Sequence, residues 1–166
     1  MFQFDIATGT KAELYRDVAA AIDAVTAGET DAVANMANVA AILWEYLPDL
    51  NWAGFYRAAG DELVLGPFQG KVACIRIAIG AGVCGAAAAS LQSQCVADVH
   101  LFPGHIACDA ESRSELVVPV VREGLLVAVI DLDSPMPARF DAEDVQGMEE
   151  IAALLSSRIW PKSGQS

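Results

Sequence analysis

Glu115-Leu-Val-Val-Pro-Val-Val-Arg-Glu-Gly-Leu-Leu-Val-Ala-Val-Ile-Asp-Leu-Asp133 is the stretch of sequence that decides the fold. Two apolar runs, 115–121 and 125–132, flank Arg122-Glu123-Gly124, which has the length of a hairpin loop. Both runs are rich in valine, leucine and isoleucine, residues that favour strands. Because both faces of the second run are apolar before Asp131, we predict that it is a buried, central strand of a sheet.

The remaining chain alternates between helical and strand-like patterns around this hairpin. Thr10 and Glu13 have capping-box spacing at the start of the first helix, and Gly28 lies where its end belongs. The expected helices lie at about 10–28, 31–46, 85–93 and from 141 onward. The expected strands lie at 51–58, 62–68, 73–79, 94–99, 115–121 and 125–132.

These elements predict an α+β fold with a central antiparallel sheet of about six strands and with N-terminal helices and a C-terminal helix packed on it. We expect residues 1–160 to form a single domain, followed by a polar C-terminal tail at 161–166. The net charge of -12 argues against nucleic acid and anionic membranes as partners. No basic leader or membrane-length apolar run is present, so we expect a cytoplasmic protein, in which structural disulfides are rare.

Carboxylates gather at one end of the predicted hairpin. Asp131 and Asp133 are two residues apart and therefore share one face of their strand. Antiparallel pairing across Gly124 brings Glu115 close to both. If this strand end is simply solvated, the three acids have no special role. If it is partly buried, at least one pKa rises, so that a neutral carboxyl group can donate a proton and the remaining charge suits an ammonium group.

The four cysteines, Cys74, Cys84, Cys95 and Cys108, contain no closely spaced pair, which disfavours a structural zinc site. We expect no metal and no cofactor, although His100, His105 and Cys108 lie close enough in sequence to leave a distorted metal site as an alternative. A buried, inert thiol fits Cys95 best, because it lies in an apolar strand. Cys108 lies in the long irregular segment 100–114, where a thiol can be accessible and Arg113 can lower its pKa.

Two further patterns each allow two interpretations. Gly80, Gly82 and Gly85 match the dinucleotide-binding spacing G-x-G-x-x-G, but the following helical stretch is too short for a parallel crossover. We therefore interpret these glycines as a tight turn that presents Cys84. Trp52 and Tyr56 share one face of the first strand; they pack in the core or form an aromatic wall for a small amphiphilic substrate.

Together these residues resemble the free methionine-(R)-sulfoxide reductases. The motifs that carry the resemblance are Asn51-Trp-Ala-Gly-Phe-Tyr56, Gly66-Pro-Phe-Gln-Gly70, Gly82-Val-Cys-Gly85, Asp98-Val-His100, Phe102-Pro-Gly-His-Ile-Ala-Cys-Asp109, Ser112-Arg-Ser-Glu115 and Asp131-Leu-Asp-Ser134. The resemblance implies a GAF fold, usually a homodimer, which reduces the R epimer of the free amino acid and uses thioredoxin or another dithiol as reductant.

The resemblance also implies roles for individual residues. Cys108 matches the nucleophile, and Cys74 and Cys84 match the other two active-site cysteines, with Cys74 expected as the principal resolving cysteine. Glu115, Asp131 and Asp133 match the substrate-binding carboxylates, one of which donates a proton, and Trp52 and Tyr56 match the pocket for the methyl group. Cys95 has no counterpart. A sensory GAF module without catalysis and a thiol redox sensor are the rival functions.

Overall fold

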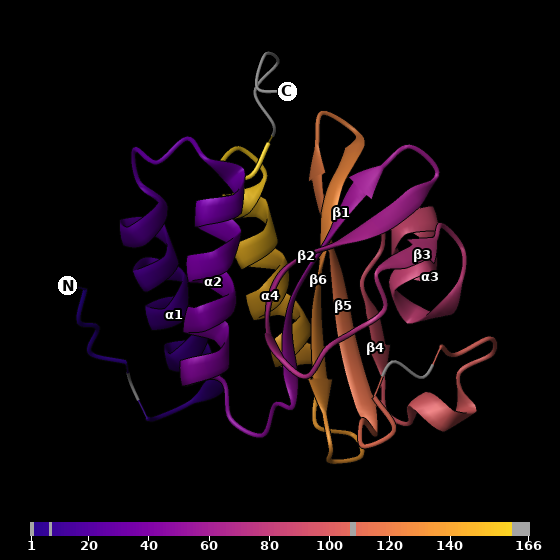
Figure 1. The fold of residues 1–166 in the computed structure, drawn as a ribbon. Helices are drawn as coiled ribbons and strands as arrows, with labels where there is room; N and C mark the ends of the chain where they lie inside the picture. The colour runs from indigo at the N-terminus through magenta and orange to yellow at the C-terminus, as the bar shows by residue number, and fades with distance from the viewer. Residues whose placement is uncertain (1, 7, 107–108, 161–166) are drawn as a thin grey trace.

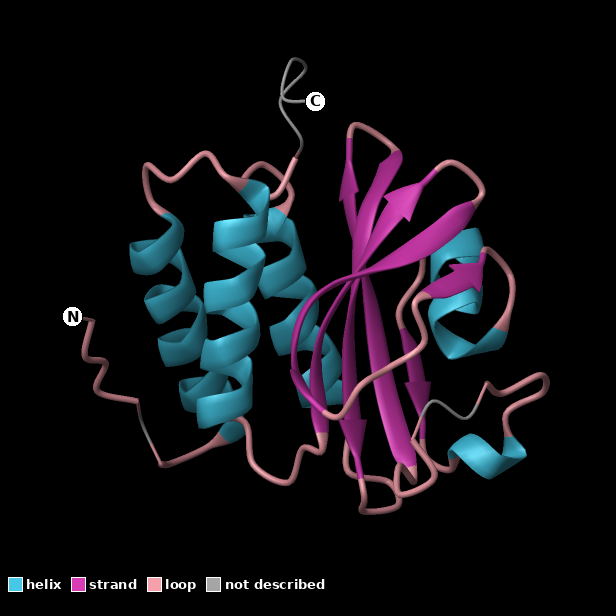
Figure 2. Ribbon diagram, in the orientation of Figure 1, coloured by secondary structure: helices cyan, strands magenta, loops and turns pink. Residues whose placement is uncertain are grey.

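The computed structural model describes residues 2–6, 8–106 and 109–160. Within these residues the helices are α1 (Lys11–Thr26), α2 (Ala32–Tyr46), α3 (Gly82–Ser90) and α4 (Ala142–Leu155), with a 3-10 turn η1 (Val99–Leu101). The strands are β1 (Trp52–Ala59), β2 (Glu62–Gly70), β3 (Arg76–Ala78), β4 (Gln94–Val96), β5 (Ser114–Arg122) and β6 (Leu125–Ser134). In the described residues they form one sheet in the order β3-β2-β1-β6-β5-β4, with every neighbouring pair antiparallel (Figure 2).

The α+β prediction is therefore confirmed, and so is the central position of the second hairpin strand. β6 lies between β1 and β5, as the apolar character of both its faces requires. The loop between β5 and β6 consists of Glu123 and Gly124, both with positive φ (52° and 77°). Two such residues make the turn that matches the twist of an antiparallel hairpin. Beyond the turn the register shifts by one residue between Val120 and Val121, and this irregularity sets the pairing farther along the two strands.

The sheet separates two hydrophobic cores. α1, α2 and α4 cover one face, and the short α3 lies on the other (Figure 1). On β6, Ile130 and Leu132 pack in the larger core with the three long helices, whereas Val129 packs in the smaller core with α3. Because side chains alternate along a strand, Asp131 and Asp133 project on the α3 side. The functional residues are thus placed on the thinly covered face of the sheet.

Several element boundaries differ from the sequence prediction. β3 is limited to Arg76–Ala78, because residues 71–75 cross as a loop held by only one bond to β2, from the Leu65 N–H to the Ile75 carbonyl (2.9 Å). α3 begins at Gly82 and ends at Ser90, about three residues earlier than expected, since its first turn already closes with Gly85 N–H on the Ala81 carbonyl (3.0 Å). No helix in the described part of the chain is long and apolar enough to cross a membrane.

Candidate active site

A cleft opens on the α3 side of the sheet, with a cavity of about 40 Å³. Its walls come from β1, β5, β6, the start of α3 and the loops before β3 and β5. Most of the site residues predicted from sequence line it: Trp52, Tyr56, Cys84, Glu115, Asp131 and Asp133. The structure therefore brings together residues that are separated by up to about 80 positions along the chain.

The three carboxylates lie where the register of β5 and β6 places them. Glu115 is paired directly with Asp133, and Val117 with Asp131, so Glu115 lies across from both aspartates on the same face. Glu115 and Asp131 are buried, at 7% and 6% exposure, and Asp133 is half-buried. The alternative of a solvated strand end is thus wrong. The Cys84 thiol lies 3.9 Å from Glu115 Oε1 and joins the same cluster.

Burial is the main cause that raises the pKa values of this cluster. It raises the pKa of Glu115 well above its usual value, and the charges of Asp131 and Asp133 add to the effect. Burial also raises the pKa of Asp131, to about 6, although hydrogen bonds with Cys84 and Glu115 oppose it. The pKa of Asp133 rises for the same reason, helped by the nearby charges of Asp131 and Asp109. All three shifts favour the neutral, protonated form of a carboxyl group in this cluster.

Aromatic side chains of β1 line the cleft beside the carboxyl groups, and Trp52 is the cross-strand partner of Asp133. The rings of Trp52 and Tyr56 are stacked with centroids 5.9 Å apart, and Phe68 of β2 stacks on the other side of Trp52 at 5.2 Å. The Tyr56 hydroxyl donates to the Cys74 carbonyl (2.9 Å), and Trp52 Nε1 donates to the Lys71 carbonyl (3.1 Å). Both rings are therefore packed in a core and also tied by hydrogen bonds to the loop that carries Cys74.

The cysteines occupy different environments. Cys84 is a free, buried thiol in the first turn of α3, and burial is the main cause that raises its pKa, followed by the charges of Asp131 and Glu115. Cys74 is half-buried in the loop before β3 and is disulfide-bonded. Cys108, the predicted nucleophile, lies outside the described residues.

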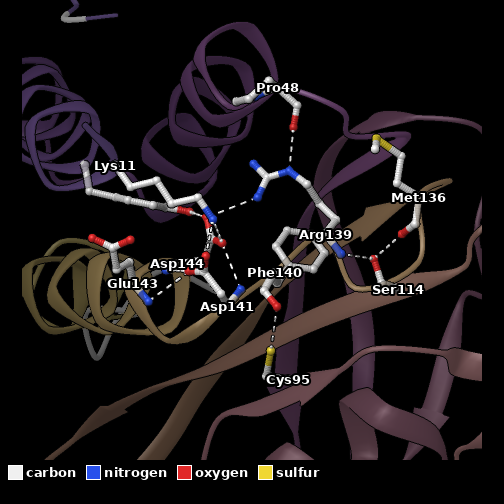
Figure 3. A network of polar contacts seen from close by, with 11 residues as sticks. Lys11, Pro48, Cys95, Ser114, Met136, Arg139, Phe140, Asp141, Glu143 and Asp144 are labelled. Carbon is white, nitrogen blue, oxygen red and sulfur yellow. Dashed lines mark hydrogen bonds and ion pairs between the residues drawn. The ribbon is translucent and has the colours of Figure 1, made fainter. Parts of the chain in front are cut away.

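The prediction that Cys95 is buried is wrong. Cys95 is a free and exposed cysteine whose Sγ lies 3.5 Å from the Phe140 carbonyl (Figure 3). The reason is its position in β4, an edge strand of three residues that pairs only with β5 in the described sheet. An apolar sequence around a cysteine does not bury it when its strand has a neighbour on one side only.

The sequence analysis did not assign a role to the polar residues at the rim of the cleft. Asn51 Nδ2 donates to Ser112 Oγ (3.2 Å) and lies 3.5 Å from Asp109 Oδ2, while Lys71 Nζ lies 3.8 Å from the same oxygen. Asp109 and Ser112 line the cleft. These contacts fasten the segment that follows Cys108 to the sheet. Asn51 and Ser112 belong to motifs quoted above, but nothing in their spacing predicts that they touch.

A second polar network holds the start of β5, the strand that carries Glu115. Ser114, the residue before Glu115, donates from Oγ to the Met136 carbonyl (2.6 Å) and accepts from the Arg139 N–H (3.3 Å). The Arg139 guanidinium reaches the Pro48 carbonyl at 3.0 Å and Asp144 at 3.1 Å (Figure 3). The start of β5 is thereby attached to α4 and to the loop that follows α2, and the backbone that carries Glu115 is held in place.

The glycine motif and the histidines have simple structural explanations. Gly80 and Gly82 both have positive φ (94° and 61°), and they form the turn that presents Cys84, as predicted. β3 and β4, the strands on either side of α3, lie at opposite edges of an antiparallel sheet, so no parallel βαβ unit is formed.

His105 lines the cleft, and its ring lies 6.4 Å from that of His100. Burial is the main cause that lowers the pKa of His105, and the charge of His100 lowers it further.

Comparison with known proteins identifies the class of fold and then the family. Residues 22–159 match the family model of the GAF domain, so the chain belongs to the GAF domain family. The free methionine-R-sulfoxide reductase of Escherichia coli K12 is 52% identical over 145 residues, which cover 87% of this chain and 88% of that protein. The Saccharomyces cerevisiae enzyme of the same name is 40% identical over 154 residues, covering 88% of this chain and 86% of that protein.

Solved structures give the same result. The X-ray structure of free methionine-R-sulfoxide reductase from Neisseria meningitidis, in complex with its substrate, matches with a TM-score of 0.92 and 46% identity, over 96% of both chains. The chain belongs to the free methionine-R-sulfoxide reductase family of GAF-domain oxidoreductases.

Proposed function

We propose that this protein reduces free methionine-R-sulfoxide to methionine and that a cysteine is oxidised in the process. The observation that carries the proposal is the cleft itself, in which three carboxyl groups with raised pKa values lie beside a stacked aromatic wall. Relatives in the same family carry the name of this activity, and one of them was solved in complex with its substrate.

Recognition of a free amino acid follows from the charges in the cleft. Asp131 and Asp133 accept the substrate's ammonium group, while Trp52 and Tyr56 pack against its methyl end. A methionine sulfoxide within a peptide lacks that ammonium group and leaves a buried acid without a cation. A buried unpaired charge is costly, so the cleft discriminates strongly against peptide-bound substrate.

The oxygen transfer uses Cys108 as the nucleophile. Its thiolate attacks the sulfoxide sulfur while a neutral carboxyl group, Glu115 in our proposal, protonates the sulfoxide oxygen. The attack forms a bond between the Cys108 sulfur and the substrate sulfur. This bond and the substrate's sulfur–oxygen bond then break as the oxygen is transferred to the Cys108 sulfur, so methionine leaves as the two-electron-reduced thioether and Cys108, oxidised by two electrons, becomes a sulfenic acid. The raised pKa of Glu115 supports this role, because an ionised carboxylate cannot donate a proton.

A second cysteine returns the enzyme to its thiol form. Cys74 attacks the sulfenic sulfur, water leaves, and an intramolecular disulfide forms; an external dithiol such as thioredoxin then reduces this disulfide by exchange and is itself oxidised. Cys74 suits this role better than Cys84, since it is half-buried and already disulfide-bonded, whereas Cys84 is a buried free thiol with a raised pKa. We place this cycle in the cytoplasm and expect a homodimer.

The test is methionine release from the separate R and S epimers with dithiothreitol as reductant. We expect turnover with the R epimer only, loss of turnover in Cys108→Ser, and little change in Cys95→Ser, whose cysteine lies outside the cleft. A folded, reduced wild-type protein without activity on the R epimer would reject the function. Activity that survives in Cys108→Ser would reject the nucleophile.

A further inference from the structure

Cys84, Glu115 and Asp131 form a compact cluster of potential metal ligands. The Cys84 sulfur and one oxygen from each carboxyl group all lie within 4.8 Å of one another, and all three residues are buried. They come from separate elements, since Cys84 is in the first turn of α3 while Glu115 and Asp131 project from the adjacent strands β5 and β6. The three side chains line the same cleft, so a small ion can enter from its mouth.

One carboxyl oxygen of this cluster lacks a hydrogen-bond partner among the described residues. Asp131 is only 6% exposed, and its Oδ1 atom, the oxygen without a partner, is fully buried. Buried polar atoms in folded proteins nearly always have a partner, and an orphaned one calls for an explanation. Three buried acidic groups beside one another repel when ionised, so a positive charge among them removes both the repulsion and the unsatisfied oxygen.

We propose that Cys84, Glu115 and Asp131 bind a thiophilic divalent cation such as Zn²⁺, at a position that overlaps, through Asp131, the place where the proposed function puts the substrate's ammonium group. Only this overlap rests on the proposed function; the cation site rests on the cluster.

The ligand chemistry selects the type of ion. One thiolate and two carboxylates offer the mixed sulfur and oxygen set that Zn²⁺ accepts, and three protein ligands leave a fourth position for water, as in open zinc sites. Mg²⁺ and Ca²⁺ prefer at least six oxygen ligands and gain nothing from a sulfur atom. Binding replaces the protons of the thiol and the carboxyl groups, so the cation displaces protons into solution when it enters.

All three ligands are present in a form of the protein in which Cys74 is disulfide-bonded. Cys84 is a free thiol in the structure in which Cys74 is disulfide-bonded, so the three ligands are available to a metal while Cys74 is not. A cation held there excludes the ammonium group of the substrate. The expected result is reversible inhibition that raises the apparent KM for methionine sulfoxide and leaves kcat unchanged.

The experiment uses Cd²⁺ as a spectroscopic probe on the oxidised full-length protein. A thiolate bound to Cd²⁺ gives an ultraviolet charge-transfer band, so we expect the band to saturate at one equivalent in the wild type and in Cys95→Ser. It should be absent in Cys84→Ser. In Asp131→Asn the affinity should fall by about tenfold or more, since even the loss of an outer-shell partner costs that much. Circular dichroism verifies that each variant is folded.

The outcomes separate the cation site from the catalytic proposal. No band in the wild type, a band that persists in Cys84→Ser, or unchanged affinity in Asp131→Asn overturns the site. Inhibition by Zn²⁺ that leaves the apparent KM unchanged overturns the overlap with the ammonium position. An enzyme that is inactive even in the presence of a chelator refutes the proposed function, whereas the Cd²⁺ spectra still decide the metal site, because they require no turnover.

Discussion

Glu115 on β5 and Asp133 on β6 are direct cross-strand partners on the thinly covered face of the sheet. Like charges in directly opposed positions of an antiparallel pair repel, and both residues are largely removed from water. The pKa values of both therefore rise, with burial as the leading cause. The hairpin thus raises the pKa of an acid beside the cleft, which favours the protonated form that a proton donor requires.

The first prediction concerns this proton donor. In the proposed function, Glu115→Gln removes the proton that the sulfoxide oxygen receives, and general acid catalysis commonly contributes about 10²- to 10⁴-fold. We expect turnover with dithiothreitol to fall by a factor in that range, while oxidation of the thiols by peroxide stays normal. Glu111→Gln is the matched control, since Glu111 is exposed and does not line the cleft. If the turnover of Glu115→Gln stays within about twofold of wild type, Glu115 is not the proton donor, and we would assign that role to one of the two aspartates.

The second prediction concerns stability and pH. The folded pKa of Asp131 is about 6 against an ordinary value of 3.8. Below about pH 4 both states hold the proton; between about pH 4 and 6 only the folded state does, so the free energy of unfolding falls as the pH rises. Above that window the penalty is constant, about 3 kcal/mol at most from about 1.4 kcal/mol per pKa unit.

Asp131→Asn removes this penalty. Urea unfolding should show that the variant is more stable than wild type at pH 7.5, by an amount that shrinks toward zero at pH 4. A gain that is the same at both pH values would show that the effect comes from packing and not from the charge.

The sequence suffices to predict the parts of the site that depend on local pattern. The hairpin at Gly124 and the two-residue repeat along a strand predict that Glu115 lies near Asp131 and Asp133, and the structure confirms that the three are close. The direct pairing of Glu115 with Asp133 also depends on the register shift between Val120 and Val121, which the sequence does not predict. The burial of Trp52 and Tyr56 on one face follows from the same repeat. These predictions succeed because hairpin pairing links residues that are close in sequence.

Other features depend on contacts between distant segments, which a single sequence does not reveal. The exposure of Cys95 follows from the place of β4 at the sheet edge, and strand order is set by packing of the whole domain. The contact of Asn51 with Ser112 joins residues 61 positions apart. The link from Arg139 to Pro48 spans 91 positions and involves a backbone carbonyl, which any residue type supplies.

The third prediction concerns the turn that presents Cys84. A Cβ atom at Gly85 would lie 2.6 Å from the Ala78 carbonyl oxygen and 3.0 Å from the Gly80 nitrogen, both backbone atoms that cannot move aside freely. Gly85→Ala should lower the free energy of unfolding by about 1–3 kcal/mol, the usual cost of overpacking. It should also reduce turnover, because α3 must shift and carry Cys84 with it.

Ala89→Ser is the control on the same helix. Ala89 is exposed, so this change should stay within about 0.5 kcal/mol of wild type. Equal stability of Gly85→Ala and Ala89→Ser in urea unfolding would contradict the close packing of α3 on the turn.

The last prediction concerns the ion pair between Arg139 and Asp144 (Figure 3). Both side chains are buried, with exposed fractions of only 8% and 1%. Asp144 also accepts hydrogen bonds from Tyr15 (2.8 Å) and Lys11 (2.6 Å). Asp144→Ala leaves the Arg139 charge buried without its partner, which typically costs about 3–5 kcal/mol. Because Arg139 also holds Ser114, kcat should fall in any variant that remains folded. Lys11→Ala, which removes a partly exposed cation, should cost no more than about 1 kcal/mol. Similar urea midpoints for the two variants would show that the pair does not anchor β5.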